Sequence, residues 1–148
     1  MSPARLARLI RPAGCPTVKA RRLAAFLAWL DGRGPEQLRA TPTRVLRREL
    51  LAVHGIGPET ADSILLYALG RRSFVVDAYA RRLLSRHGWA GPRAGYDDLR
   101  RLFQAALPRS QRLYNEYHAL IVRLGKTHCR SAPRCDGCPL EDFPRPAP

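Results

Sequence analysis

The stretch that decides the fold is residues 49–82, which read ELLAVHGIGPETADSILLYALGRRSFVVDAYARR. Two segments with apolar residues at helical spacing meet at a glycine-flanked turn, residues 55–57. A short apolar run, residues 74–76, follows and ends at Asp77. The pattern predicts two helices joined by a tight turn, and then a buried segment that delivers one carboxylate.

The predicted turn suits the binding of a phosphate. Glycine lacks a Cβ, so Gly55 and Gly57 can take backbone angles closed to other residues and let another backbone come close. Pro58 suits the first position of the next helix, because its missing N–H costs nothing there. The free amides at that helix start, with the positive end of its dipole, form a site for one phosphate, and Ile56 is expected to point inward. A plain helical corner with tightly packed glycines is the alternative.

These residues resemble the helix-hairpin-helix motif of the endonuclease III (HhH-GPD) family of DNA glycosylases. The resemblance runs from about Leu9 to Leu140 and includes the loop that ends in the family's catalytic aspartate. It implies an all-α glycosylase fold in which the hairpin amides bind a backbone phosphate beside the lesion and Asp77 is the catalytic carboxylate. Aspartate is also a preferred N-cap, so capping of the following helix is the competing interpretation of Asp77.

Glu59 stands where strand-cutting members of the family carry a lysine, two residues after the second hairpin glycine. A carboxylate cannot form the Schiff base that an amine makes with the sugar, so no lyase step is expected. The sequence therefore resembles the monofunctional branch, including its 3-methyladenine-type members. There Asp77 would stabilise an oxocarbenium-like sugar and orient or deprotonate the attacking water.

The partner that the resemblance implies is double-stranded DNA containing a damaged base. The target base must be flipped out, because its glycosidic carbon is unreachable inside a duplex. The family's wedge loop falls at residues 15–20, where Cys15 is small for that role and a loop thiol is the alternative. The DNA-contacting residues implied are Gly55, Ile56, Gly57, Glu59, Thr60, Cys15, Lys19 and Arg81. A protein that binds DNA without excision, and a structural metal or cluster protein, remain alternative functions.

Composition agrees with a nucleic-acid partner. The 148 residues contain 26 Lys and Arg against 12 Asp and Glu, which gives a net charge of +14. This excess of positive charge favours a polyanion as the binding partner. The length and the 45% hydrophobic content suit one globular domain. No apolar run approaches the roughly 18 residues of a membrane span, and no secretory signal is seen. We therefore expect a cytoplasmic monomer without membrane association, found on the nucleoid when it binds DNA.

Periodicity and capping residues predict an all-α chain with no strand. Beside the hairpin, whose first helix should bury Leu46, Leu50 and Val53, the predicted helices are 4–10, 17–30 capped by Thr17, 35–39, 78–87, 96–106 and 110–124 capped by Ser110. The expected division is a helical glycosylase domain, 1–124, and a cysteine-rich loop and tail, 125–148. The family has several helices before the point where the resemblance begins. The fold is therefore expected to be incomplete at its N-terminus, with apolar faces exposed.

Three cysteines near the end of the chain, Cys129, Cys135 and Cys138, have the spacing C-x5-C-x2-C. A short cluster of this kind in an intracellular protein favours a metal site over disulfides. In the endonuclease III family this segment holds a [4Fe–4S] cluster through four cysteines, but the fourth position is Pro144 here. His128 and Asp142 are the nearest other candidates for the fourth ligand. Zinc bound as Cys3His and a loop held only by packing are the alternatives.

Overall fold

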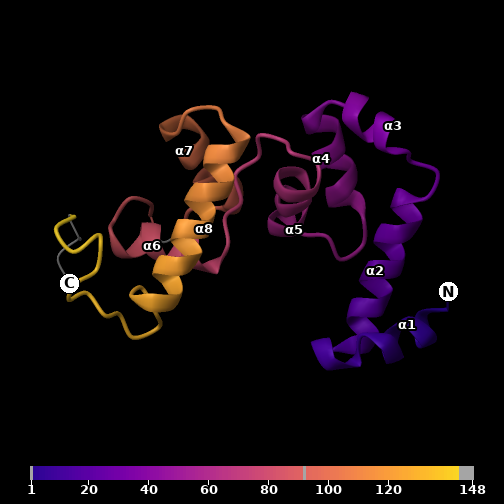
Figure 1. Cartoon of the computed structure of the whole chain (residues 1–148), viewed down its shortest axis with the longest axis horizontal. Helices are drawn as coiled ribbons and strands as arrows, with labels where there is room; N and C mark the ends of the chain where they lie inside the picture. The colour runs from indigo at the N-terminus through magenta and orange to yellow at the C-terminus, as the bar shows by residue number, and fades with distance from the viewer. Residues whose placement is uncertain (1, 92, 144–148) are drawn as a thin grey trace. The chain divides into compact units, whose positions relative to one another are not determined.

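The structure is a computed structural model that describes residues 2–91 and 93–143. Within these residues the chain is helical and contains no strand, which confirms the all-α prediction. None of the described helices has the length and apolar character needed to cross a membrane. The helices labelled in Figure 1 are α1 (Pro3–Leu9), α2 (Pro16–Leu30), α3 (Pro35–Ala40), α4 (Thr43–Ala52), α5 (Pro58–Ser63), α6 (Ala78–Arg86), α7 (Tyr96–Ala106) and α8 (Gln111–Thr127).

The chain divides into two compact units, Met1–Ala61 and Asp62–Pro148, with the boundary inside α5. In the first unit α1 packs against α2. Leu46 and Leu50 of α4 are buried as the periodicity predicts. Val53 is only half-buried, because α4 ends at Ala52 and Val53 is its C-cap. The division predicted at residue 124 separates a helical domain from a cysteine-rich loop and tail, and it stays a prediction.

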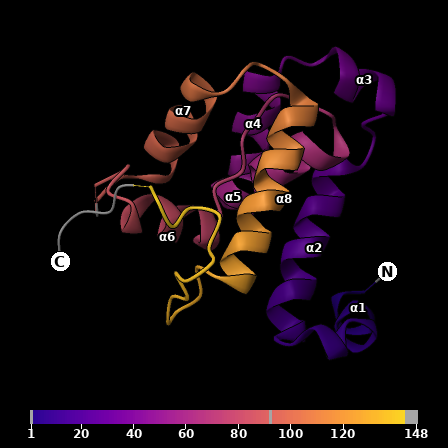
Figure 2. The ribbon, with the colours of Figure 1, turned by 60° about the vertical axis from the view of Figure 1, so that its left-hand side comes forward.

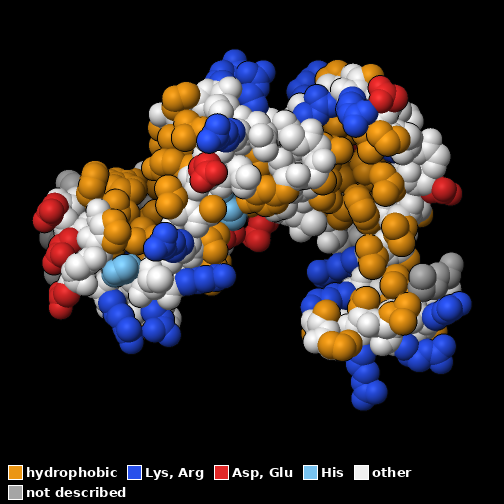
Figure 3. All heavy atoms as spheres, viewed as in Figure 1, with side chains coloured by type: hydrophobic (Ala, Val, Ile, Leu, Met, Phe, Trp, Pro, Cys, Tyr) orange, Lys and Arg blue, Asp and Glu red, His pale blue; other side chains and the backbone are white. Residues whose placement is uncertain are grey.

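The helix α2 differs from its prediction at the start, and part of its apolar surface is exposed. It begins at Pro16 with Cys15 as its N-cap, so Thr17 lies in the first turn and is not the cap. Proline is preorganised for the first helical position, which moves the start upstream. Leu23 and Leu27 of this helix are 36% and 49% exposed. Figure 3 shows apolar side chains on the surface along this helix.

The second unit is built around Phe74, which is fully buried and stacks on Phe103 with ring centroids 4.1 Å apart. The helices α6 and α8 pack side by side, as Figures 1 and 2 both show. At this crossing, a Cβ on Gly125 would collide with the ring of Tyr79, so glycine allows the close approach. The remaining residues of this core are Leu66, Val75, Val76, Ala80, Leu83, Leu84, Leu99, Tyr114 and Ile121.

The last helix, α8, runs three residues beyond its predicted end, to Thr127. Ser110 caps it as predicted, because its Oγ accepts the Leu113 N–H at 3.2 Å. Of the neighbouring apolar residues Leu120 and Ile121, Ile121 is buried but Leu120 is 60% exposed. Tyr114 is buried instead, beside Phe74. In Figure 3 apolar side chains gather over α8, so the expected exposure of apolar faces is confirmed for this helix and for α2.

Candidate active site and cysteine loop

The turn between α4 and α5 takes the predicted tight form. Gly55 has a φ of +85°, and a Cβ there would also collide with the side chain of Arg22. Ile56 is 9% exposed, and its N–H donates to the Val53 carbonyl at 3.1 Å. Gly57 differs from Gly55, because a Cβ there would meet no atom of the described residues within 4 Å. The first glycine is therefore required by the backbone and by packing, and the second is not.

The helix after the turn begins at Pro58, as predicted, and carries Glu59 in its first turn. Glu59 and Thr60 are both exposed. The first amides of a helix lack partners within that helix, so this end offers N–H groups at the protein surface. The α5 helix continues directly into a π-helical turn, Ile64–Ala68, which carries Tyr67.

The other residues predicted to contact DNA lie at exposed positions. Cys15 is exposed, with a positive φ of 46°. Lys19 Nζ donates a hydrogen bond to the Ala13 carbonyl, so this lysine is tied to the loop before α2. Arg81 is exposed and donates from Nη1 to the Ala94 carbonyl at 2.8 Å. Their contacts with DNA stay predictions.

Asp77 is the N-cap of α6. Its Oδ1 accepts the Ala80 N–H at 2.8 Å. Its Oδ2 faces His118 of α8, with Nε2 3.5 Å away, and the two side chains are 14% and 12% exposed. On the other side of the ring, His118 Nδ1 lies 2.6 Å from Tyr67 Oη. The capping role considered in the sequence is therefore present, and it leaves one carboxylate oxygen outside the cap.

Two effects act on the pKa of Asp77. Burial raises it, but hydrogen bonds from His118 and from the Ala80 N–H lower it, and the net result is a pKa below the ordinary 3.8. The carboxyl group is therefore ionised at neutral pH. A carboxyl whose pKa is lower in the folded protein stabilises the fold at pH values above its unfolded pKa. That contribution is lost as the pH falls through the lowered value.

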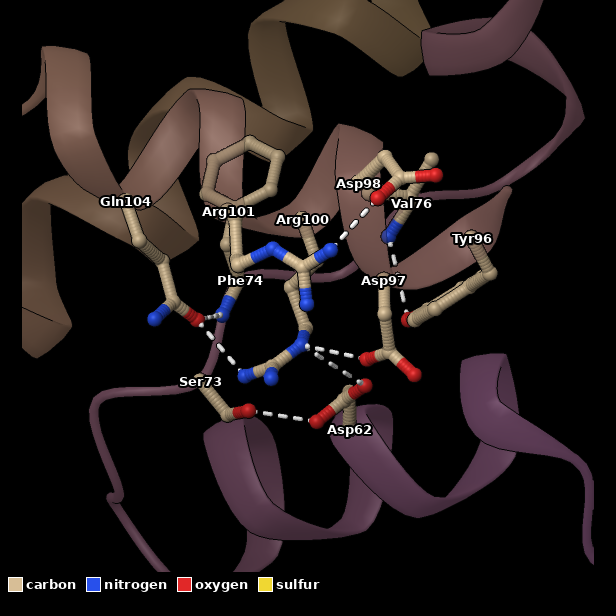
Figure 4. A network of polar contacts seen from close by, with 10 residues as sticks. All are labelled: Asp62, Ser73, Phe74, Val76, Tyr96, Asp97, Asp98, Arg100, Arg101 and Gln104. Carbon is tan, nitrogen blue, oxygen red and sulfur yellow. Dashed lines mark hydrogen bonds and ion pairs between the residues drawn. The ribbon is translucent and has the colours of Figure 1, made fainter. Parts of the chain in front are cut away.

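The loop that carries Asp77 is held by side chains of α7, as Figure 4 shows. The Phe74 N–H donates to Gln104 Oε1 at 3.1 Å. The Val76 N–H donates to Tyr96 Oη at 3.3 Å. An extended segment has no neighbouring strand here to accept these amides, so the polar side chains of α7 take that place.

A buried carboxylate completes this anchor. The Asp62 side chain is fully buried and accepts a hydrogen bond from Ser73 Oγ through Oδ1. Its Oδ2 lies 3.9 Å from Nε of Arg100, which also donates to Asp97 Oδ1 at 3.1 Å. The loop is thus tied both to α5 and to α7 before it reaches Asp77. No local sequence pattern pointed to Asp62, Ser73 or Arg100.

The three cysteines of the C-terminal segment line one hollow together with His128 and His87. Two arginines of α6 support this segment. Arg82 Nε donates to the Cys129 carbonyl at 2.7 Å. Arg86 donates to the carbonyl of Ser131 at 2.7 Å and lies 3.4 Å from the Cys129 sulfur. None of the four cysteines forms a disulfide.

Comparisons with known proteins identify the family. No protein-family model matches the chain. It is similar to MJ1434 of Methanocaldococcus jannaschii, provisionally named a DNA repair glycosylase, with 47% identity over 143 residues. It is also 38% identical over 99 residues to endonuclease III of Sulfolobus acidocaldarius. A solved non-covalent endonuclease III–DNA complex matches the fold with a TM-score of 0.79 at 24% identity.

The chain belongs to the endonuclease III-like family. Its alignment with MJ1434 covers 94% of this chain and 65% of that protein. The alignment with the Sulfolobus endonuclease III covers 66% of this chain and 44% of that protein. The match to the solved endonuclease III covers 98% of this chain and 65% of that one. The chain therefore spans about two thirds of the length of MJ1434 and less than half of the Sulfolobus relative.

The cysteine loop is the part of this endonuclease III-like chain in which a metal group was predicted. No three His, Cys, Asp or Glu side chains of the described part of the chain lie close enough together to share one metal ion. Of the two candidate fourth ligands, His128 lines the hollow with the cysteines and Asp142 does not. Pro144, the family's fourth cysteine position, lies outside the described residues.

Proposed function

We propose that the chain is a monofunctional DNA glycosylase that hydrolyses the N-glycosidic bond of a damaged base, such as an alkylated one, in double-stranded DNA. The observation that supports this most is the state of Asp77. It is an ionised carboxylate with one oxygen outside the cap, at the end of a loop anchored on two sides. The capping bond itself uses only Oδ1 of the two carboxylate oxygens.

Asp77 performs two tasks in this mechanism. As the bond between C1′ and the base nitrogen breaks, positive charge develops on the sugar, and the nearby carboxylate stabilises it. Water then attacks C1′ and gives a proton to the carboxylate, while the electron pair of the broken bond leaves with the base. Both tasks require the ionised carboxyl group that the lowered pKa of Asp77 provides at neutral pH.

Glu59 supports hydrolysis without strand cleavage. It lies exposed in the first turn of α5, at the position of the family's lyase lysine. The proposed product is therefore an abasic site in an intact strand. The test is an excision assay on duplexes with alkylated, oxidised or mismatched bases, analysed with and without alkali and with borohydride. Excision that needs alkali for strand breakage, without a trapped protein–DNA adduct, supports the proposal, and DNA binding without excision of any base indicates the binding-protein alternative.

The hairpin turn is proposed to bind a phosphate of the DNA backbone. Gly57 supports this proposed phosphate site, because no atom of the described residues would contact a Cβ at this position. A small residue is therefore not needed there for packing, whereas an approaching phosphate would need the space. The neighbouring amides at the start of α5 lie at exposed residues and can donate to it.

Replacing Gly57 with serine is expected to weaken DNA binding about tenfold or more without lowering the melting temperature. Serine is a favoured N-cap, and its Oγ would take an amide that a phosphate would otherwise use. Binding is measured on an undamaged duplex at several salt concentrations. The matched control is Gly34→Ser, at the N-cap of α3, where a Cβ also meets nothing within 4 Å. Equal affinities for the two variants would contradict the phosphate site.

We propose that Cys129, Cys135 and Cys138 hold a [4Fe–4S] cluster and that His128 is its fourth ligand. The donor set fits, because three thiols and His128 line one hollow. The Arg86 guanidinium and the Leu140 N–H lie 3.4 and 3.5 Å from the sulfurs of Cys129 and Cys138, where they would stabilise thiolates. The group would support the loop and supply no step of base excision.

Replacing Cys135 with serine is expected to remove most of the bound iron and the visible absorption of the purified protein. The melting temperature should fall too, because metal binding contributes to folding. Iron and zinc are measured by elemental analysis. Cys15→Ser is the control, since Cys15 is exposed at the start of α2, and it should leave the iron content unchanged. A wild-type protein containing zinc, or no metal, would contradict the cluster.

A further inference from the structure

Tyr67, His118 and Asp77 form a chain of polar contacts in the second unit. His118 Nε2 is buried, and among the described residues it has no partner closer than the Asp77 carboxylate. An ionised carboxylate only accepts hydrogen bonds, so a proton between these two groups must be on Nε2. In neutral imidazole the other nitrogen is then an acceptor, and Nδ1 faces the Tyr67 hydroxyl at 2.6 Å.

Tyr67 is suited to donate that second hydrogen bond. Burial, and then the negative charge of Asp77, raise the pKa of Tyr67, so its hydroxyl keeps its proton. The residue lies on the π-helical turn, where the Leu69 N–H donates to the Ile64 carbonyl at 3.1 Å. Single π-helical turns occur frequently at functional sites, and this one carries the side chain that contacts His118.

We propose that His118 is a positioning residue for Asp77 and that Tyr67 fixes the tautomer of His118. The inference rests on the proposed function of Asp77. With Oδ1 bound to the Ala80 N–H and Oδ2 facing Nε2–H, both oxygens of the carboxylate are directed by donors. The 3.5 Å contact is long for a hydrogen bond. Such contacts are often long in free enzymes and shorten when substrate binds.

The kinetic test separates positioning from folding. His118→Leu should slow single-turnover excision by up to about 100-fold, because misplacing a catalytic group by an ångström has that cost. His118→Gln should recover most of the rate, because its amide can donate from nearly the same place as Nε2. The dissociation constant for the duplex should not change in either variant. Equal rates for wild type and His118→Leu, or equal losses for the leucine and glutamine variants, would overturn the proposal.

Tyr67→Phe is a second, milder variant and should slow excision several-fold. Its control is Tyr117→Phe, which removes another hydroxyl from a partly exposed tyrosine and should leave the rate unchanged. Equal rates for the Tyr67 variant and this control would overturn the role of Tyr67.

The ring-nitrogen NMR signals of His118 provide a readout that does not depend on activity. In its neutral form, the His118 ring of the wild-type protein should show a proton on Nε2 and none on Nδ1. A proton on Nδ1 would overturn the proposed arrangement. If the wild type excises no base but shows the Nε2–H tautomer, the proposed function fails while the polar chain stands. If it excises a base but carries the proton on Nδ1, the function stands and the inference fails.

Discussion

Replacing Asp77 with asparagine is expected to slow base excision by about 10²- to 10⁴-fold, the usual contribution of a carboxylate in general acid–base catalysis. Asparagine is as good an N-cap as aspartate, so α6 should keep its cap and the protein its melting temperature. Only the negative charge and the proton acceptor are lost. The rate is measured in single turnovers on the best substrate found, and the affinity for the same duplex is measured separately.

The control for this variant is Asp98→Asn. Asp98 lies in the first turn of α7, and its Oδ2 accepts the Gly95 N–H at 3.0 Å, so it too is an acid at a helix start. The Asp98→Asn variant should excise the damaged base at the wild-type rate. If Asp77→Asn retained that rate as well, capping would be the only role of Asp77 and the proposed mechanism would fail. Loss of binding together with excision would instead indicate damage to the fold.

Replacing Asp62 with alanine is expected to lower the free energy of unfolding by about 2 to 3 kcal/mol, the typical cost of leaving buried polar partners unsatisfied. The Asp62 side chain is fully buried and holds Ser73 and Arg100. Arg100 keeps its bonds to Asp97 and Gln104, which limits the loss. Urea unfolding measures the change. Excision should fall as well, because the loop that carries Asp77 loses one of its two anchors.

Glu36→Ala is the control for this stability effect. Glu36 forms an ion pair with Arg39 at 2.6 Å, but the two side chains are 90% and 72% exposed. Exposed pairs of this kind contribute between about 0 and 1 kcal/mol, because solvent screens both charges. If Asp62→Ala cost no more than Glu36→Ala, the buried network would not be what holds the loop.

The sequence by itself determined the features that depend on neighbouring residues. Helix starts could be predicted from Ser110 and Asp77, because a cap bonds to an amide only three residues away. The tight turn could be predicted from Gly55, whose positive φ other residues avoid. The cysteine spacing likewise indicated a shared site. These interactions join residues that are close in the sequence, so they can be predicted from the sequence alone.

Only the tertiary structure decided which distant side chains meet. Tyr67 and His118 are 51 positions apart, and Arg82 reaches a carbonyl 47 positions away. Periodicity indicates which face of a helix is apolar, but it does not say what covers that face, and Leu27 and Leu120 are 49% and 60% exposed. A hydrogen bond depends on distance in space. The partners of Asp77 and of the cysteine loop are therefore set by how α6, α7 and α8 pack in the second unit.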